Sequence, residues 1–351
     1  MRIQDIHQQL ASIGAKPIHI GRVTRAWLNG TPLDTGTRHQ RTEDFLPLSV
    51  RNGLHEVSQS IEGLARLSSE HPGSDGSARL LVALADGQMV ESVLLPRAGL
   101  CVSSQVGCAV GCVFCMTGKS GLLRQLGSAE IVAQVALARR FRPVKKVVFM
   151  GMGEPAHNLD NVLDAIDLLG TDGGIGHKNL VFSTVGDRRV FERLPLQKVK
   201  PALALSLHST DAALRRELLP RAPQFDPAEL VELGEAYARL VDYPIQYQWT
   251  LLKGINDSQD EMDGIIRLLR GKFAIMNVIP YNSLDDDEFQ RPEADRIHQI
   301  MRYLHENGVL TKVRNSAGQD IDGGCGQLRA RAERVIRARQ RPAESPVLDA
   351  N

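Results

Sequence analysis

Long apolar runs are missing from this sequence. No run among its 351 residues approaches the roughly 18 apolar residues of a transmembrane helix. The opening segment MRIQDIHQQL contains charged residues and glutamines where a secretory signal has an apolar block. We therefore expect a cytoplasmic protein that has no membrane partner.

An excess of charge of one sign is also missing. The 42 Lys and Arg residues nearly balance the 41 Asp and Glu residues, and the formal net charge is +1. This balance neither requires nor excludes a polyanionic partner, so nucleic-acid binding has to come from local basic segments. No coiled-coil repeat or large apolar stripe indicates self-association, and we expect a monomer.

Cysteine is scarce and unevenly distributed. The chain has 5 cysteines, and all but one of them lie in CVSSQVGCAVGCVFC at residues 101–115. The odd number and the reducing compartment expected for the chain both argue against permanent disulfides. We therefore expect these cysteines to be metal ligands or reactive thiols.

Cys108, Cys112 and Cys115 have the spacing C-x3-C-x2-C, which presents three thiolates from one short loop. Gly107 and Gly111 allow the backbone turns that would bring the sulfurs together. A cubane iron–sulfur cluster takes one cysteine sulfur per iron, so three ligands leave one iron open to another molecule. A zinc site is the weaker alternative because no second ligand pair follows downstream, and unliganded core cysteines are a third.

Strand-length apolar segments alternate with helix-length segments after residue 101. The apolar segments lie at 146–151, 179–183, 202–207, 245–252, 273–279 and 309–313. The intervening helical segments include 158–169, 226–240, 259–269 and 293–306. This alternation predicts an α/β fold with a parallel sheet and crossover helices, curled into a barrel or partial barrel.

Small, polar and acidic residues follow several of these predicted strands. The sequence Gly-Met-Gly-Glu-Pro occupies 151–155, and Ser183, Ser206, His208 and Asn282 stand at further strand ends. Catalytic groups of α/β barrels lie at this edge of the sheet. Loops after strands are polar in most proteins, but two glycines and a glutamate directly after an apolar strand favour a ligand site.

The segments that flank the predicted barrel have other compositions. Residues 1–70 predict a helical accessory domain whose basic face, with Arg22 and Arg25, either binds RNA or is only solvated on a capping domain. Residues 71–100 predict a β-hairpin extension around an Asp-Gly pair, with Glu91 on its second strand. The barrel is expected over 101–328.

The C-terminal part contains the fifth cysteine and the most basic run. Cys325 lies in GGCG, which is typical of a mobile loop with a reactive thiol rather than of a packed core cysteine. Residues 329–351 predict a basic helix and tail. Its arginines suit a phosphate backbone, and a poorly ordered solvated helix is the alternative.

The motifs of this chain closely resemble those of the RlmN/Cfr family of radical S-adenosylmethionine (SAM) RNA methyltransferases. The resemblance extends from about residue 74 to 328. It rests on CVSSQVGC-x3-C-x2-C, TGK at 117–119, FMGMGEP at 149–155, LDNV at 159–162, SLH at 206–208, GIND at 254–257 and DIDGGCGQL at 320–328. The resemblance implies a radical SAM partial barrel with a small helical N-terminal accessory domain.

The resemblance also implies cofactors and residue roles. A [4Fe-4S] cluster is expected on Cys108, Cys112 and Cys115, and two SAM molecules are expected per turnover. Cys325 is implied as the residue that carries the methyl group, Glu91 as the proton acceptor, and Cys101 as the thiol that resolves the intermediate through a transient disulfide with Cys325. The residues implied in cofactor binding are Gly153, Glu154, Ser183, Ser206, Leu207, His208 and Asn282.

The implied reaction is methylation of a ring carbon of adenine, with C2 preferred, in ribosomal or transfer RNA. It proceeds through a covalent protein–RNA adduct and needs an external electron donor such as flavodoxin and its reductase. The sequence departs from the family pattern near His157 and Trp249, and we expect these departures to concern the RNA surface. The alternatives are a radical SAM enzyme with another RNA or non-RNA substrate, and an iron–sulfur protein that binds RNA or senses redox state without turnover.

Overall fold

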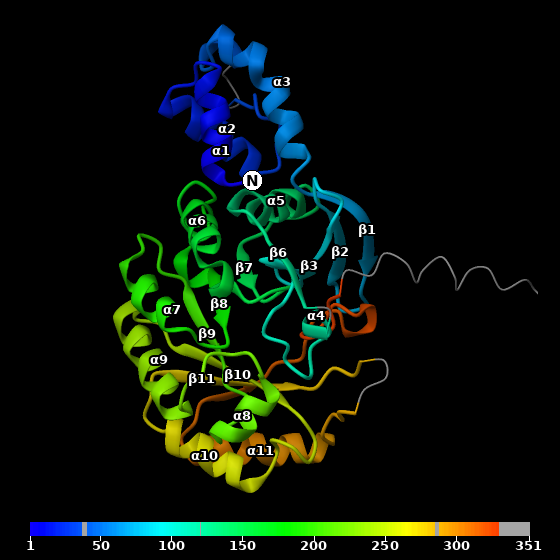
Figure 1. The fold of residues 1–351 in the computed structure, drawn as a ribbon, viewed down its shortest axis with the longest axis vertical. Coiled ribbons are helices and arrows are strands. Elements are labelled where there is room, and N and C mark those ends of the chain that lie inside the picture. The colour runs from blue at the N-terminus through cyan, green and yellow to red at the C-terminus, as the bar shows by residue number, and fades with distance from the viewer. Residues whose placement is uncertain (37–40, 120, 285–287, 330–351) are drawn as a thin grey trace, which may run out of the picture.

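A ten-stranded mixed sheet organises the chain, for which the computed structural model describes residues 1–36, 41–119, 121–284 and 288–329 (Figure 1). The strand order is β1-β2-β3-β4-β7-β8-β9-β10-β11-β12. The bounds are β1 (Arg66–Pro72), β2 (Ala78–Ala83), β3 (Met89–Leu95), β4 (Gly99–Cys101), β7 (Lys146–Phe149), β8 (Leu180–Thr184), β9 (Ala202–Ser206), β10 (Ile245–Leu251), β11 (Ala274–Pro280) and β12 (Thr311–Val313). A separate antiparallel pair joins β5 (Gln105–Gly107) and β6 (Leu122–Gln125).

From β4 to β12 every neighbouring pair of strands in the sheet is parallel. Crossover helices connect these strands, as the alternating pattern predicted. Their bounds are α5 (Ser128–Arg139), α6 (Leu159–Gly170), α7 (Arg188–Arg193), α8 (Ala212–Leu218), α9 (Pro227–Val241), α10 (Gln259–Leu269) and α11 (Ala294–Glu306). Asp226 and Ser258 begin α9 and α10 by accepting backbone N–H bonds from residues 228 and 261. The predicted α/β architecture is confirmed.

The strands β1, β2 and β3 extend the parallel part of the sheet as an antiparallel meander. The turn between β2 and β3 contains Gly87, whose φ of 82° is a left-handed conformation that glycine adopts without a Cβ clash. Glu91 and Val93 lie on one face of β3, and Val93 is paired with Cys101 of β4. The hairpin therefore places Glu91 on the same face of the sheet as Cys101.

Three helices form one end of the molecule: α1 (Ile3–Ser12), α2 (Pro17–Leu28) and α3 (Leu48–Glu62), at the top of Figure 1. Arg25 of α2 forms an ion pair with Asp172 at 2.8 Å, and the Arg22 guanidinium stacks 4.3 Å from the Phe45 ring centroid. Both arginines of the predicted basic face therefore have protein partners. The role of this unit in RNA binding stays a prediction.

The interior of the sheet contains large side chains. Trp249 and Tyr247 of β10 are fully buried. The sequence departure at Trp249 therefore lies in the core and not on an RNA surface, which corrects the expectation from the sequence. The predicted basic helix at 329–351 lies outside the described residues, except for Arg329. No described helix combines the length and the apolar character needed to cross a membrane.

Candidate active site

A cavity of about 150 Å³ opens at the carboxyl ends of the parallel strands. The residues that line it come from the cysteine loop, from six successive strand ends and from the C-terminal segment. They include Cys108, Cys112, Cys115, Gly153, Glu154, Ser183, Ser206, His208, Gln248, Thr250, Arg314 and Cys325. Five of the seven residues expected to bind the cofactor are in this lining: Gly153, Glu154, Ser183, Ser206 and His208.

The cysteine loop is held in a turn that requires glycine at its start. Gly107 has a φ of 80°, and a Cβ there would lie 2.0 Å from the carbonyl oxygen of Gly121. Burial raises the pKa of the Cys112 thiol well above its ordinary value, and the nearby Cys115 and Cys108 raise it further. The three sulfurs therefore lie within electrostatic range of one another on one wall of the cavity.

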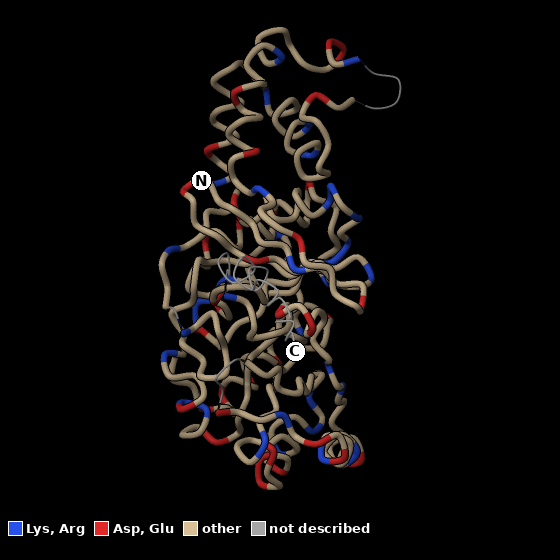
Figure 2. Tube along the Cα trace, turned by 90° about the vertical axis from the view of Figure 1, so that its right-hand side faces the viewer, with Lys and Arg blue, Asp and Glu red and all other residues tan. Residues whose placement is uncertain are grey.

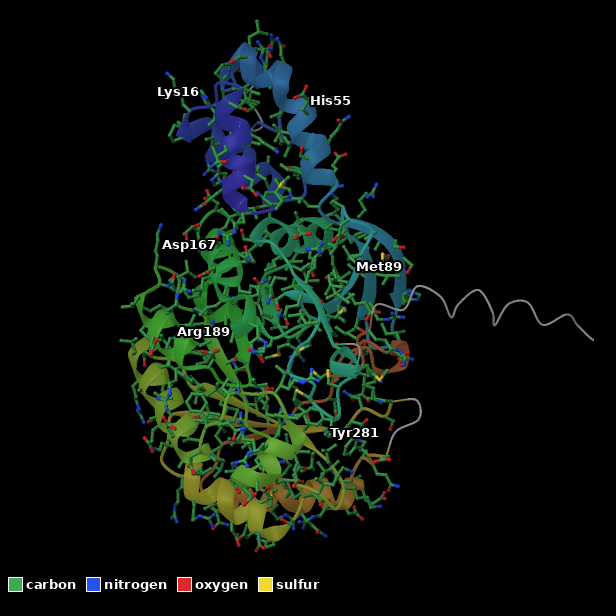
Figure 3. All side chains as sticks on the ribbon, viewed as in Figure 1. Lys16, His55, Met89, Asp167, Arg189 and Tyr281 are labelled. Atoms are coloured by element: carbon green, nitrogen blue, oxygen red, sulfur yellow. The ribbon has the colours of Figure 1, made fainter. Side chains whose placement is uncertain are left out.

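The donor set determines which inorganic group these thiols can hold. Within the described ranges, no three or more His, Cys, Asp or Glu side chains are arranged around a position for one metal ion. A structural zinc ion needs such an arrangement, whereas a cubane cluster binds each cysteine sulfur to a different iron. The three thiols that line this cavity therefore fit three of the four ligand positions of a [4Fe-4S] cluster. Cys108 and Phe114 also pack in one apolar cluster with Tyr281, which Figure 3 labels.

Glu154 is fixed in the cavity wall by backbone groups. Its Oε1 accepts the N–H of Ala156 at 3.0 Å, and its Oε2 accepts the N–H of Val185 at 3.0 Å. Burial raises the pKa of Glu154 to about 7, and hydrogen bonds from Thr184, Ala156 and Val185 oppose this effect. A carboxyl group in such an environment can accept a hydrogen bond from the ammonium or hydroxyl group of a bound cofactor.

His208 is a buried neutral base at the end of β9. Its Nδ1 accepts the N–H of Thr250 at 2.9 Å, so the ring proton is on Nε2. The ring contacts Phe114 edge to face, with a centroid distance of 4.9 Å. The pKa of His208 is lowered to about 3, mainly by burial and also by the positive charge of Arg215. His208 therefore supports the cysteine loop through Phe114 while remaining uncharged.

His208 makes the fold sensitive to acid. Its pKa is about 3 in the folded protein and about 6.5 when unfolded. The unfolded chain therefore binds the proton first, and stability falls as the pH decreases below about 6.5, reaching a loss of about 2 kcal/mol at pH 5. We expect His208→Asn to lack this part of the pH dependence, as measured by urea unfolding of cluster-free protein. Equal pH slopes for the variant and the unchanged protein would contradict the assignment.

A second cavity of about 180 Å³ lies next to the first. Cys101 and Cys325 both line it, together with Val148 of the neighbouring strand β7 and Met150 directly after that strand. Cys325 lines both cavities. The pKa of Cys101 is raised to about 12, mainly by burial and also by the nearby Cys325, and the charge of Arg314 opposes this shift. The two thiols that are 224 positions apart, at residues 101 and 325, therefore share one chamber.

The Cys325 loop is fastened to the cysteine loop by hydrogen bonds. The N–H of Met116 donates to the carbonyl of Gly326 at 2.7 Å, and the Thr117 hydroxyl donates to the carbonyl of Leu328 at 2.6 Å. Both donors belong to α4 (Met116–Lys119), which directly follows Cys115. This connection explains how the C-terminal thiol reaches the wall of the first cavity.

Asn282 and Leu207 have other contacts than those expected of cofactor ligands. The Asn282 side chain donates to the carbonyl of Cys325 at 3.0 Å and to the Ser316 hydroxyl at 2.9 Å. Leu207 is fully buried, and its N–H donates to the carbonyl of Gln248. Neither residue is in the lining of the first cavity. Asn282 positions the Cys325 loop, and contact of either residue with the cofactor stays a prediction.

Glu91 lies beneath the C-terminal segment and lines neither cavity. Its side chain is 2% exposed, and it forms an ion pair with Arg79. Its Oε2 accepts the backbone N–H of Arg329 at 2.7 Å. Arg79 also donates to the carbonyl of Ile321 at 2.7 Å. Glu91 is therefore close to the Cys325 loop in space, but both its oxygens have partners.

Arg314 is a site residue that was not expected from the sequence. Its guanidinium lines both cavities and donates to Gln248 Oε1 at 2.9 Å. It directly follows β12, so the strand-end pattern that pointed to Ser183 and Ser206 could have identified it.

Comparisons with known proteins agree with this geometry. Residues 102–269 match the Radical SAM superfamily. The chain belongs to this superfamily. It is 81% identical over 97% of its length to a "Probable RNA methyltransferase" of Stutzerimonas stutzeri, all of which is covered, and 75% identical over 96% of its length to another of Chromobacterium violaceum, 96% of which is covered.

A solved structure adds the whole fold to this comparison. A radical SAM methyltransferase from Sphaerobacter thermophilus matches with a TM-score of 0.82 and 31% identity, covering 94% of this chain and 98% of that one. The chain is accordingly a radical SAM methyltransferase, whose cofactors are a [4Fe-4S] cluster and SAM.

Proposed function

We propose that this radical SAM methyltransferase methylates a ring carbon of adenine in RNA, with C2 preferred, by the chemistry of the RlmN/Cfr family. The observation that carries the proposal is the place of Cys325, which lines both the cavity of the cysteine loop and the cavity that contains Cys101. The Cys325 thiol can thus reach the cofactor in the first cavity and the resolving thiol of Cys101 in the second. The relatives named as RNA methyltransferases support RNA as the substrate.

Each wall of the first cavity has a role in this proposal. Cys108, Cys112 and Cys115 hold the cluster, and Glu154, Gly153, Ser183, Ser206 and His208 surround SAM. When bound, the cluster and SAM supply a methyl group and the one-electron chemistry that breaks an inert C–H bond, with two SAM molecules used per turnover. Gly153 has a φ of 104°, and a Cβ there would lie 2.5 Å from the Gln105 side chain. Only glycine leaves room at this point of the wall.

The two remaining thiols complete the reaction. The Cys325 sulfur takes the methyl group, and one hydrogen atom of that group is removed by the one-electron chemistry that the cluster and SAM would supply. The methyl carbon then becomes bonded to the adenine ring, and one electron is returned to the cluster. After the ring proton has left, the Cys101 thiolate attacks the Cys325 sulfur. An S–S bond forms while the C–S bond from Cys325 to the base breaks, the released carbon takes up a proton to become the methyl group, and an external reductant restores the two thiols. All five cysteines are free in this structure. Burial keeps Cys101 protonated, since it raises the pKa of this thiol to about 12, which restrains premature attack.

Glu91 is the proton acceptor in this proposal. The N–H of Arg329 occupies its Oε2, so the segment around residue 329 has to move away before the carboxylate can reach a base bonded to Cys325. Arg79 stays beside the other oxygen and keeps the side chain in place.

The proposal includes the partners implied by the family. These are ribosomal or transfer RNA and an electron donor of the flavodoxin type. The protein acts as a cytoplasmic monomer, with residues 1–70 as an accessory unit at one end of the barrel and 71–100 as the hairpin that supplies Glu91.

The test is anaerobic incubation of the cluster-loaded protein with SAM, a reductant and total RNA from a host that lacks the gene. Mass spectrometry of the RNA nucleosides is expected to show a new C-methyladenosine, and its fragmentation identifies the ring position. A matched reaction without reductant is expected to show none. Formation of deoxyadenosine without any modified nucleoside would move the substrate elsewhere.

A further inference from the structure

Three cationic side chains, those of Lys146, Lys312 and Arg314, lie on or directly after the strands that border the cavity of the two thiols. Lys146 begins β7, and it shares a face of this strand with Val148, which lines the second cavity. Lys312 of β12 shares a face with Arg314, which lines the same cavity. In this second cavity, one wall comes from β7 and the opposite wall comes from the end of β12. Lys146 therefore lies on one side of the opening of this cavity, and Lys312 and Arg314 lie on the other side.

Contacts across the opening show that the two walls are close. The Arg314 guanidinium donates to the sulfur of Met150, just beyond β7, at 3.2 Å. The pKa of Lys146 is lowered by desolvation and then by the positive charges of Arg314 and Lys312. Three like charges thus lie within electrostatic range of one another. Such an arrangement costs free energy unless an anion joins it.

No acidic side chain in the described ranges supplies this anion. In the part of the chain that the structure describes, none of Lys146, Lys312 and Arg314 takes part in an ion pair. Other cations of the barrel do have such partners: Lys272 pairs with Glu232 and Lys253 with Glu293. Acidic and basic residues are interspersed over most of the molecule (Figure 2). This opening is therefore a local excess of positive charge.

We propose that Lys146, Lys312 and Arg314 bind a backbone phosphate of the RNA nucleotide whose base enters the chamber of Cys101 and Cys325. This inference rests on the proposed function. An enzyme that acts on a ring carbon has to take the base out of its stack, and the phosphates next to an extruded base need fixed partners. Arg314 presents a planar fork to a phosphate, and the two lysines act as point charges.

The three cations lie where a bound phosphate would hold its nucleotide near Cys325. The lysines are exposed while Arg314 is half-buried, so the positive charge extends from solvent to the chamber wall. A phosphate held there keeps its nucleotide within reach of Cys325, which lines the same cavity as Arg314. The site does not distinguish between bases, because lysine and arginine bind phosphate without regard to the nucleotide sequence.

The test compares anaerobic, cluster-loaded proteins in binding a fluorescent oligoadenylate of about 12 nucleotides, a length within the range of single-strand sites. The double variant Lys146→Gln/Lys312→Gln is expected to bind roughly tenfold more weakly, and the slope of log K against log salt is expected to become shallower by about 0.7, the value for one phosphate on a single strand. Lys145→Gln removes the neighbouring exposed lysine and is expected to leave both values unchanged. The charge-preserving variant Lys146→Arg/Lys312→Arg is expected to retain binding and slope.

An unchanged salt slope in a glutamine variant with normal iron content and melting temperature would overturn the proposal. So would an equal loss of affinity in Lys145→Gln. Methylation of total RNA by the unchanged enzyme is scored separately. The phosphate site can therefore fail while the methyltransferase function stands, and absence of any methylated nucleoside would refute the function whatever the binding slope.

Discussion

Cys112→Ala is expected to abolish the iron–sulfur cluster. The three thiols of the loop lie on one cavity wall, and each one is needed because each sulfur binds a different iron. Hydrophobic packing of Phe114 and Tyr281 around the loop cannot replace a lost ligand. We expect iron in the anaerobically reconstituted variant to fall to about a tenth or less, and SAM cleavage to fall by about a thousandfold or more.

Iron analysis, visible absorbance and deoxyadenosine formation measure this effect. The matched control is Cys101→Ala, because Cys101 is also buried and free but is not in the lining of the cluster cavity. This control is expected to keep the cluster and the reductive cleavage of SAM. Retention of a full cluster in Cys112→Ala, or equal loss in both variants, would contradict the assignment of the ligands.

The alternation of strands and helices was predictable because it is a local property of the sequence. All six predicted strands of the barrel and the helices α6, α9, α10 and α11 lie where the apolar pattern placed them. The helix α5 was not predicted from the apolar pattern. Residues 128–138 are all buried, because α5 packs on α6 on one side and on the N-terminal helices on the other. A helix that is covered all round has no polar face, so the periodic signal is absent.

In the candidate site, too, local features could be predicted from the sequence and contacts between distant segments could not. The cysteine loop and the strand ends follow from short motifs, and the structure brings most of these residues to one cavity. Contacts between distant segments could not be predicted. The ties from Met116 and Thr117 to the Cys325 loop, and the bond from Arg329 to Glu91, join residues more than 200 positions apart. They depend on the path of the C-terminal segment across the sheet, which no local pattern specifies.

Cys325→Ala is expected to abolish RNA methylation, with a loss of about a thousandfold or more, because no sulfur remains to carry the methyl group. The substitution leaves the loop in place, since Asn282 and Met116 bind backbone carbonyls of residues 325 and 326. The cluster and the reductive cleavage of SAM are therefore expected to persist. Nucleoside mass spectrometry measures the product, and iron content shows that the site is intact.

The companion variant Cys101→Ala separates the two thiols. Cys325 can still form its bond to RNA in this variant, but the attack that releases the product is missing. We expect a protein–RNA adduct to accumulate, visible as a species of reduced mobility on denaturing gels that RNase digestion removes. The double variant is expected to form no adduct, because the carbon bond to the base depends on Cys325. Normal methylation by Cys325→Ala, or an adduct in the double variant, would show that the shared chamber of these thiols is not the path of the methyl group.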